Sequence, residues 1–361
     1  MSTIGGEEVK STWVTRQITP DLPIVWRPVS KVVAGDLLLC EVVRTGLHGR
    51  VETTAASRRK LYAGDRIVCA VANRYATALL EGVAEIDGEH ADMISASGLC
   101  GRIVAHTQKA SNPTSLRIVG QAFVDDKPFN LRSPARAVAG AAVREPRWII
   151  VVGSSMDSGK TTACSSIIRG LVEKGHKVGA AKVTGTASGR DFGSFSDAGA
   201  RPVLDFLDAG FASTAGCDIA ELLDVTGYLA SHLRAADLDC GVIEIADGLL
   251  QPETRALLEH IRGVLPDPEI VVTTREAMSA VGAVEMLSAL GFQVAALSGL
   301  LTNSPLVRRE AELGSGVTTV ATSDLGRWFA KRIARETRVV DARVVDPLVP
   351  PLGDTLKTAS Q

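Results

Sequence analysis

The chain has 361 residues, of which 45% are hydrophobic and 22% charged, a composition typical of a globular protein long enough for two domains. Its formal net charge of −2 gives no support to a surface that binds nucleic acid or anionic lipid. No apolar run approaches the roughly 20 residues of a membrane helix. The N-terminus also lacks the basic and then apolar build of a secretory signal. We therefore expect a cytoplasmic protein with neither a nucleic-acid nor a membrane partner.

The N-terminal part predicts a small domain made mainly of strands. Residues 1–30 are polar and interrupted by proline, which indicates an arm. From about 31 to 130 the pattern is that of β structure, with two similar apolar runs at 35–43 and 64–72 that each begin with Gly-Asp. Their similarity suggests a duplicated hairpin in a barrel-like fold. Residues 131–146 have the composition of a linker.

The connection between these two runs is rich in glycine and arginine. It reads RTGLHGRVETTAASRRKLYAG, residues 44–64, and contains His48. Together with Asn73–Thr77 it forms either a surface for a ligand or partner, or a solvated hairpin. The six cysteines of the whole chain include no C-x-x-C pair, which indicates reduced and buried thiols.

From residue 147 the pattern changes to strands that alternate with helices. Apolar strands are predicted at 147–153, 177–185, 240–248, 269–274 and 294–303. Helical patterns lie near 159–174, 252–264 and 278–290, with further helical stretches up to about 236. Buried strands separated by helices predict a three-layer α/β domain with a parallel sheet, over 147–343. Residues 344–361 are rich in proline and are expected to form a loose tail.

The first of these strands leads into a phosphate-binding pattern. VVGSSMDSGKTTACSSII, residues 151–168, joins a strand to a helix through glycine and small polar residues. In such a turn, backbone N–H groups and the helix dipole receive phosphates, while a lysine reaches the outer phosphates and a hydroxyl reaches Mg²⁺. Five residues, not four, separate the two glycines of the turn. The residues predicted to hold the nucleotide phosphates are Gly153, Asp157, Ser158, Gly159, Lys160, Thr161 and Thr162.

A loop of this length resembles that of dethiobiotin synthetase and its relatives, which are P-loop NTPases. The resemblance continues in AAKVTGTASGRDFGSFSDAGA (180–200), in GVIEIADG (241–248) and in GLLTN (299–303), and covers roughly 147–310. It implies an ATP site in a P-loop NTPase domain. The roles it implies are Lys182 and Thr186 at the γ-phosphate and the acceptor, Thr161, Asp197 and Glu244 at Mg²⁺, and Asn303 at adenine.

Several of these residues have a second interpretation. Asp197 is either a metal ligand or the N-cap of a helix that starts near 198. Asn303 either contacts adenine or caps the next helix. Asp247 is a turn residue or a substrate contact, and it stands where the dethiobiotin synthetase family has a glycine-rich turn. Glu244 ends a buried parallel strand, where a carboxylate needs a partner and where α/β sheets bind ligands.

The order of the two domains resembles that of the D-glutamate N-acetyltransferase-like group, in which a P-loop domain also follows an N-terminal domain.

Three functions follow from these patterns. The first is an ATP-dependent ligase or kinase that activates a small carboxylate or carbamate, with Lys160, Lys182 and Thr186 in catalysis. The second is an N-acyltransferase that holds acetyl-CoA in the loop and acts on an amino acid. The third is a nucleotide-dependent switch that binds a partner. The first resemblance also implies a homodimer.

Overall fold

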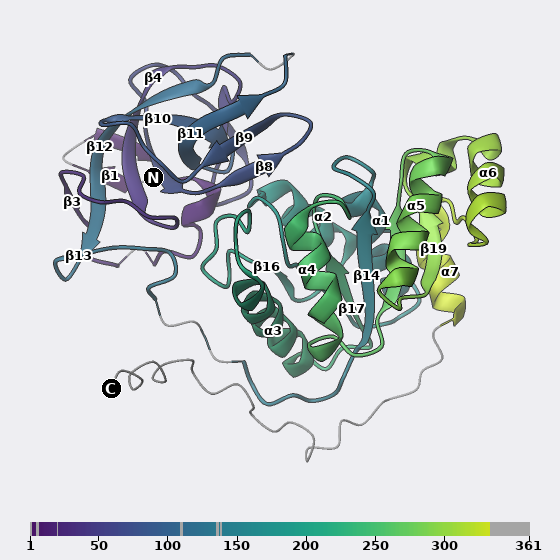
Figure 1. Ribbon diagram of the computed structural model, residues 1–361. Coiled ribbons are helices and arrows are strands. Elements are labelled where there is room, and N and C mark those ends of the chain that lie inside the picture. The colour runs from purple at the N-terminus through teal and green to yellow at the C-terminus, as the bar shows by residue number, and fades with distance from the viewer. Residues whose placement is uncertain are drawn as a thin grey trace, which may run out of the picture.

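The computed structural model describes residues 2–4, 7–19, 21–108, 111–134, 137 and 139–332 (Figure 1). Within them the chain forms a strand-rich N-terminal domain and an α/β domain that follows it, seen as two lobes in Figure 1. The predicted tail at 344–361, and the predicted end of the α/β domain at 343, lie outside the described residues. No helix among the described residues combines the length and the hydropathy that a bilayer crossing requires.

Five strands of the N-terminal domain close into a barrel. They pair in the order β7-β4-β12-β10-β11, and β11 then pairs with β7 in parallel, so that the ring has no open edge. Their bounds are β4 (Leu37–Arg44), β7 (Arg66–Val71), β10 (His90–Ser95), β11 (Leu99–His106) and β12 (Thr114–Val124). The two similar apolar runs of the sequence form β4 and β7, which are antiparallel neighbours.

Shorter elements surround the barrel. Strands β5 and β6 form a hairpin beside it, while β8 and β9 extend its sheet. The bounds are β1 (Ser2–Ile4), β2 (Glu7–Lys10), η1 (Trp13–Thr15), β3 (Val25–Arg27), β5 (Arg50–Glu52), β6 (Arg58–Lys60), β8 (Arg74–Ala76), β9 (Leu80–Val83) and β13 (Lys127–Pro128). Five of the six cysteines are buried, and three of them lie inside the barrel: Cys40, Cys69 and Cys100.

The α/β domain has a parallel six-stranded sheet in the order β16-β15-β17-β14-β18-β19. The strands are β14 (Arg147–Gly153), β15 (Val178–Lys182), β16 (Val203–Asp205), β17 (Cys240–Glu244), β18 (Glu269–Thr273) and β19 (Val294–Ser298). Because all six strands run the same way, their carboxyl ends meet at one edge. The prediction of a parallel sheet in an α/β domain is confirmed.

Helices cover both faces of this sheet and make three layers. In β14, Ile149 and Val151 belong to the apolar cluster with α1 and α7, whereas Ile150 and Val152 belong to the cluster with α3, α4 and α5. This alternation is what a strand buried on both faces requires. The helices are α1 (Lys160–Val172), α2 (Gly189–Ala198), α3 (Ile219–Ala235), α4 (Pro252–His260), η2 (Ile261–Gly263), α5 (Ala277–Ala289), η3 (Leu300–Asn303), α6 (Pro305–Ser315), η4 (Thr322–Asp324) and α7 (Leu325–Arg332).

The N-terminal segment that the sequence suggests to be an arm lies between the domains. Trp13 and Val14 are buried in an apolar cluster that also contains Phe206 of the α/β domain. Arg16 pairs with Asp205 at 2.8 Å and with Asp208 at 2.9 Å, and all three side chains are nearly inaccessible to solvent. Trp13 and Val14 belong to no periodic apolar pattern, so the sequence shows no sign of this contact.

Candidate functional site

The loop between β14 and α1 is a tight turn held by the neighbouring strands. Gly159 has φ +105° and Asp157 has φ +58°, both in the left-handed region that turns the chain back on itself. A Cβ on Gly159 would lie 3.3 Å from the Cα of Gly299, so this turn packs against the end of β19. Ser158 is fully buried, and its Oγ lies 2.8 Å from the Oγ1 of Thr273 on β18. Its side chain therefore anchors the loop, which leaves backbone groups and Lys160 for a ligand.

Lys160 is the first residue of α1 and lies across the loop. Its Nζ donates hydrogen bonds to the carbonyl of Ser155 at 2.9 Å and to the carbonyl of Asp247 at 2.6 Å. Burial lowers the pKa of Lys160, and the charges of Glu244 and Asp247 partly offset this effect. Two neutral carbonyls are weak partners for a buried ammonium, so an anion that replaced them would gain a charge-assisted bond.

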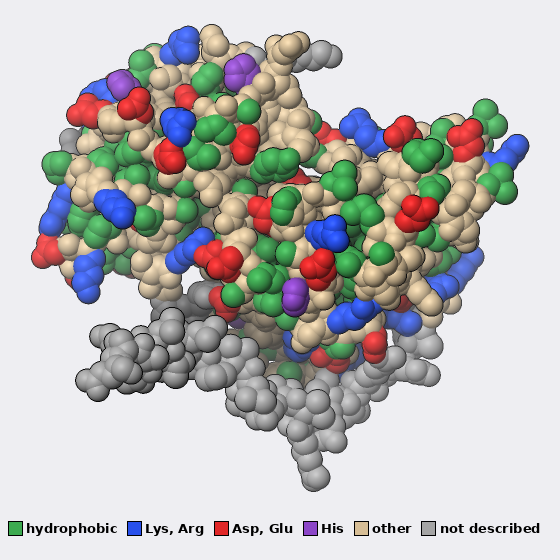
Figure 2. Space-filling view, viewed as in Figure 1, with side chains coloured by type: hydrophobic (Ala, Val, Ile, Leu, Met, Phe, Trp, Pro, Cys, Tyr) green, Lys and Arg blue, Asp and Glu red, His purple; other side chains and the backbone are tan. Residues whose placement is uncertain are grey.

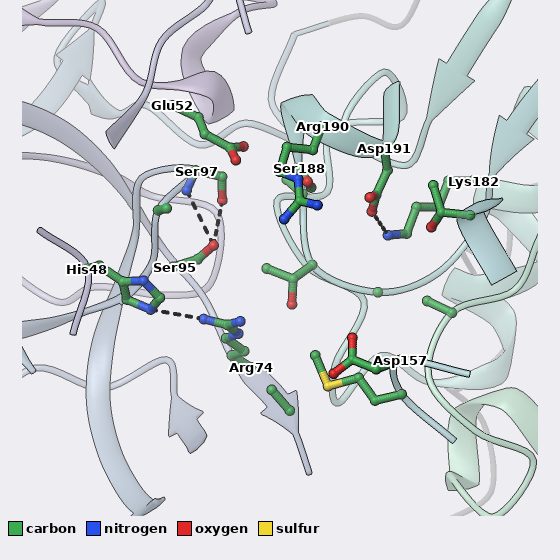
Figure 3. A pocket seen from close by; sticks show the side chains of 18 of the residues that line it. His48, Glu52, Arg74, Ser95, Ser97, Asp157, Lys182, Ser188, Arg190 and Asp191 are labelled. Carbon is green, nitrogen blue, oxygen red and sulfur yellow. Dashed lines mark hydrogen bonds and ion pairs between the residues drawn. The ribbon is translucent and has the colours of Figure 1, made fainter. Parts of the chain in front are cut away.

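Next to this lysine, the carboxyl ends of β15 and β17 bring two charged residues together. Lys182 and Glu244 are register partners on these strands, and Lys182 Nζ lies 3.7 Å from Glu244 Oε1. Lys182 also forms an ion pair with Asp191 of α2 (Figure 3). Although burial alone would lower it, these two carboxylates raise the pKa of Lys182. Lys182 is therefore a fixed cation at the sheet edge.

Glu244 fits a role as a metal ligand. Burial raises its pKa, while the charges of Lys182 and Lys160 and the hydroxyl of Thr161 partly offset this effect. The second oxygen, Oε2, is buried and has no hydrogen-bond partner among the described residues. A buried and unpartnered carboxylate oxygen is costly. Mg²⁺ prefers oxygen ligands of this kind, and the donors available here are Glu244 and Thr161.

The structure does not bring Asp197 to this site. Asp197 is exposed in the last turn of α2, which ends at Gly199 with φ +107°. The interpretation as an N-cap near 198 is also wrong, because the helix ends there. The residue beside Lys182 is instead Asp191, in the first turn of the same helix. Because the helix starts about nine residues earlier than expected, Asp191 and not Asp197 lies beside Lys182.

Two further predicted residues lie apart from the strand ends. Asn303 is exposed at the end of η3, and the cap of α6 is Ser304, whose Oγ accepts a hydrogen bond from the Val307 N–H at 3.4 Å. The interpretation of Asn303 as that cap is therefore wrong, and its contact with adenine stays a prediction. Thr162 is exposed on α1, whereas Gly153 ends β14 at the base of the loop.

Lys160, Lys182 and Glu244 face a cavity of about 710 Å³ that lies between the two domains. The space-filling view shows a notch between the two lobes, with acidic and basic side chains interspersed on the face shown (Figure 2). The α/β domain lines the cavity with Asp157, Lys160, Thr161, Lys182, Thr186 and Glu244, among others. The barrel domain lines it with His48, Arg50, Lys60, Arg74, Ser95 and Ser97, among others. The predicted site is thus one wall of a two-domain cavity.

Asp247, whose role the sequence leaves open, is part of this cavity. It has φ +61°, a conformation that few residues other than glycine adopt. Burial raises the pKa of its carboxyl group, and Lys160 and Lys182 partly offset this effect. Its carbonyl holds Lys160 while its side chain lines the cavity. It therefore acts on the loop through its backbone and is available to a ligand through its carboxylate.

On the opposite wall, Arg74 of β8 lies beside His48 (Figure 3). Arg74 Nη1 donates to the Ile94 carbonyl and lies 3.2 Å from His48 Nε2. Burial and, to a smaller extent, the charge of Arg74 lower the pKa of His48 to about 4. Burial also lowers the pKa of Arg74, to about 10. At neutral pH the pair is therefore a neutral imidazole beside a charged guanidinium, and His48 Nε2 also lies 3.2 Å from the Ile94 carbonyl oxygen.

Glu52 of β5 connects the barrel domain to α2. Its Oε2 accepts a hydrogen bond from the Gly189 N–H at 2.9 Å, and its Oε1 accepts one from Arg58 Nη2 at 3.1 Å. The N-cap residue of α2, Ser188, forms no capping bond with its own side chain. A buried carboxylate of one domain thus caps a helix of the other, where it also meets the positive end of the helix dipole.

Sequence analysis identifies the loop side of the cavity better than the barrel side. Residues 44–64 and Asn73–Thr77 suggest a ligand surface only as one of two interpretations, and the structure places His48, Arg50 and Arg74 from them on the cavity wall. Their arginines and glycines are the only signal in the sequence. Their approach to Lys160 depends on how the domains dock, which no local pattern encodes.

No protein-family model matches the chain, and no curated protein sequence is similar to it. Among solved structures, the chain is similar to the signal recognition particle receptor FtsY from Elizabethkingia anophelis, with 20% identity, 48% of this chain and 60% of that chain covered, and a TM-score of 0.32. It is also similar to the signal recognition particle 54 kDa protein from Aeropyrum pernix K1 in complex with GDP, with 15% identity, 54% and 45% covered, and a TM-score of 0.37. A third is the cell division protein FtsY from Thermotoga maritima, with 18% identity, 52% and 65% covered, and a TM-score of 0.35.

These overlaps are partial, since the chain spans 60% of the first of these proteins. The topology of the α/β domain has a parallel sheet, a glycine-lysine turn after a central strand and helices on both faces.

Proposed function

We propose that the protein is an enzyme that binds a magnesium nucleotide and transfers its terminal phosphoryl group to a small carboxylate or carbamate. One observation supports this most strongly. Lys160, Lys182 and Glu244, which lie on three separate elements, line one cavity at the carboxyl edge of a parallel sheet, and one Glu244 carboxylate oxygen is buried without a partner.

The loop would receive the phosphates through its backbone N–H groups and the N-terminus of α1. Lys160 would exchange its two carbonyl partners for phosphate oxygens, while Lys182 would face the terminal phosphoryl group. Mg²⁺, held by Thr161 and Glu244, would supply further neutralisation of phosphate charge. The residues thus match the main needs of phosphoryl transfer, which are the positioning of two reactants and the neutralisation of charge.

In the proposed reaction an oxygen of the acceptor carboxylate or carbamate forms a bond to the terminal phosphorus. The bond from that phosphorus to its bridging oxygen breaks, and the nucleoside diphosphate leaves with the electron pair. No proton has to be removed from an acceptor that is already anionic, so the chemistry needs no strong base. Thr186, which lines the cavity, is proposed to contact the acceptor or the transferred group.

We propose ATP as the nucleotide, with Asn303 at the base, and a homodimer as the assembly. Both proposals come from the resemblance of the loop and strand segments to dethiobiotin synthetase. Titrations with ATP and with GTP compare the two bases directly, and light scattering coupled to gel filtration measures the assembly.

The test of the function is turnover with Mg-ATP and a panel of small carboxylic and carbamic acids. We expect at least one acid to stimulate release of ADP, and Lys160→Ala to abolish the stimulation. Lys174→Ala is the matched control, because Lys174 is exposed just after α1 and lies outside the cavity. If nucleotide binds but no acid in the panel gives turnover, the result would contradict the proposed enzymatic activity. It would favour a nucleotide-dependent switch that binds a partner. Competition of acetyl-CoA with ATP would favour acyl transfer.

A further inference from the structure

The two walls of the cavity carry opposite charge. The α/β wall has three cations and four carboxylates, a net charge of −1, which suits a bound Mg²⁺. The barrel wall has four cations and one carboxylate, a net charge of +3, with His48 neutral at pH 7. Those five residues are Arg50, Arg58, Lys60, Arg74 and Glu52. In a chain with a net charge of −2, this wall is a local concentration of positive charge.

Most of this charge has no internal counter-ion. Arg58 pairs with Glu52 at 3.1 Å. Within the described part of the chain, none of Arg50, Lys60 and Arg74 forms an ion pair with a carboxylate. Cations that face one cavity without partners repel one another, so the wall is stabilised by an anion that binds there.

Arg74 is the best-defined of these cations. Hydrogen bonds from Nη1 to the Ile94 carbonyl and His48 fix its guanidinium, and Nε is buried without a partner. The hydroxyls of Ser95 and Ser97, which lie 2.9 Å apart, line the cavity on the same wall (Figure 3). A fixed guanidinium next to hydroxyl groups is suited to carboxylate or phosphate oxygens.

The position of this wall separates it from the nucleotide. Lys182 and Asp157 lie on the other side of the cavity in Figure 3. Lys160 and the loop backbone belong to the same α/β domain and already provide the donors that the phosphates need. Arg74 of the barrel wall and Asp247 of the α/β wall nevertheless line the same cavity, and their charges interact. The cavity thus has room and charge for a second anionic ligand beside the nucleotide.

We infer that the barrel domain is the recognition domain for the acceptor, and that Arg74 binds an oxyanion group of the acceptor other than the reacting one. This inference rests on the proposed function. The acceptor is then a small molecule that carries a carboxylate or a phosphate-like group in addition to the carboxylate or carbamate that receives the phosphoryl group.

The test is calorimetry on the full chain with Mg²⁺ and adenylyl imidodiphosphate bound. The probes are butyrate, which has one anionic group, succinate, which has two carboxylates, and 3-phosphonopropionate, which has a carboxylate and a phosphonate. We expect one of the two dianionic probes to bind at least 10-fold more tightly than butyrate, and which one does so identifies the oxyanion. Arg74→Gln should weaken the binding of that probe at least 10-fold and leave the affinity for the nucleotide within twofold of the wild-type value.

Two further variants complete the design. Arg102→Gln is the control, since Arg102 is exposed on β11, pairs with Glu85 and lies outside the cavity. Arg50→Gln changes an exposed residue of the cavity, so it tests the barrel wall even if the Arg74 variant unfolds. It should weaken the binding of the same probe several-fold. The inference would be overturned if all probes bound equally or if no probe bound. It would also be overturned if Arg74→Gln lowered the affinity for the nucleotide instead of the affinity for the probe. If the wild-type protein does not bind nucleotide, the proposed function itself is contradicted.

Discussion

Glu244, the proposed magnesium ligand, has a cost in stability. Its carboxylate is buried, and only one of its oxygens lies near a cation. Because burial raises its pKa, the folded state favours the protonated form, and the unfavourable effect on stability grows as the pH rises. Residues that carry such an effect are common at functional sites, where activity and stability oppose each other.

We expect Glu244→Gln to be at least as stable as the wild type at pH 8, because it removes the buried charge but leaves Lys182 paired with Asp191. The same change should abolish the dependence of nucleotide binding on Mg²⁺. Urea unfolding measures the first effect, and nucleotide titration with and without Mg²⁺ measures the second. A loss of several kcal/mol in stability with unchanged Mg²⁺ dependence would show that Glu244 is a structural residue.

His48 should make stability depend on pH in a mildly acidic range. Its pKa in the folded protein is about 4, compared with an ordinary value of 6.5. A depressed pKa gives stability that is present above pH 6.5 and is lost as the pH falls towards 4. Between pH 7.5 and pH 5 the wild type should lose about 2 kcal/mol more than His48→Gln, as measured by urea unfolding. Equal losses in both proteins would mean that His48 titrates normally.

Among the elements, the loop between β14 and α1 depends on a glycine that lies far away in the sequence. Gly299 has φ +87°, and a Cβ there would lie 2.4 Å from the Ser158 carbonyl oxygen. Gly299→Ala should therefore displace the loop, destabilise the protein by about 1–3 kcal/mol and weaken nucleotide binding. Gly282→Ala is the control, because Gly282 lies in α5 with open space around it and should be neutral or slightly stabilising. Equal effects of the two changes would contradict this account of the loop.

The contact from β5 to α2 should also be measurable. Glu52→Ala removes the acceptor for the Gly189 N–H and the partner of Arg58, and leaves a buried helix end without its cap. We expect a loss of about 1–3 kcal/mol in unfolding free energy. Glu85→Ala, which removes an exposed ion pair with Arg102, should change it by less than about 1 kcal/mol. If the two variants are equally stable, Glu52 does not hold the domains together.

The start of α2 also illustrates a limit of the sequence. Lys182 and Glu244 could be predicted because each ends an apolar strand, and such ends meet at one edge of a parallel sheet. Asp191 could not, because Ser188-Gly189 is a weak helix start in sequence, whereas Ser196-Asp197 has the composition of a cap. The helix begins earlier because Glu52 of the other domain caps it.

For the whole molecule, the docking of the domains determines the site. The barrel and the α/β sheet are both predicted by local patterns, since strands and helices follow apolar periodicity. Their contact depends on Trp13, Arg16 and Glu52, which are scattered residues without a shared pattern. The loop wall of the cavity is therefore predictable from the sequence, whereas the basic wall that faces it becomes clear only in the structure.

We expect the turn before α1 to bind nucleotide phosphates through Lys160. The most direct test is calorimetry of Mg-ATP and Mg-GTP with the wild type, Lys160→Ala and the control Lys174→Ala. We expect saturable binding of one nucleotide, weakened about 10- to 100-fold by Lys160→Ala and unchanged by Lys174→Ala. Equal affinity of the wild type and Lys160→Ala, or no binding of either nucleotide to the wild type, would contradict it.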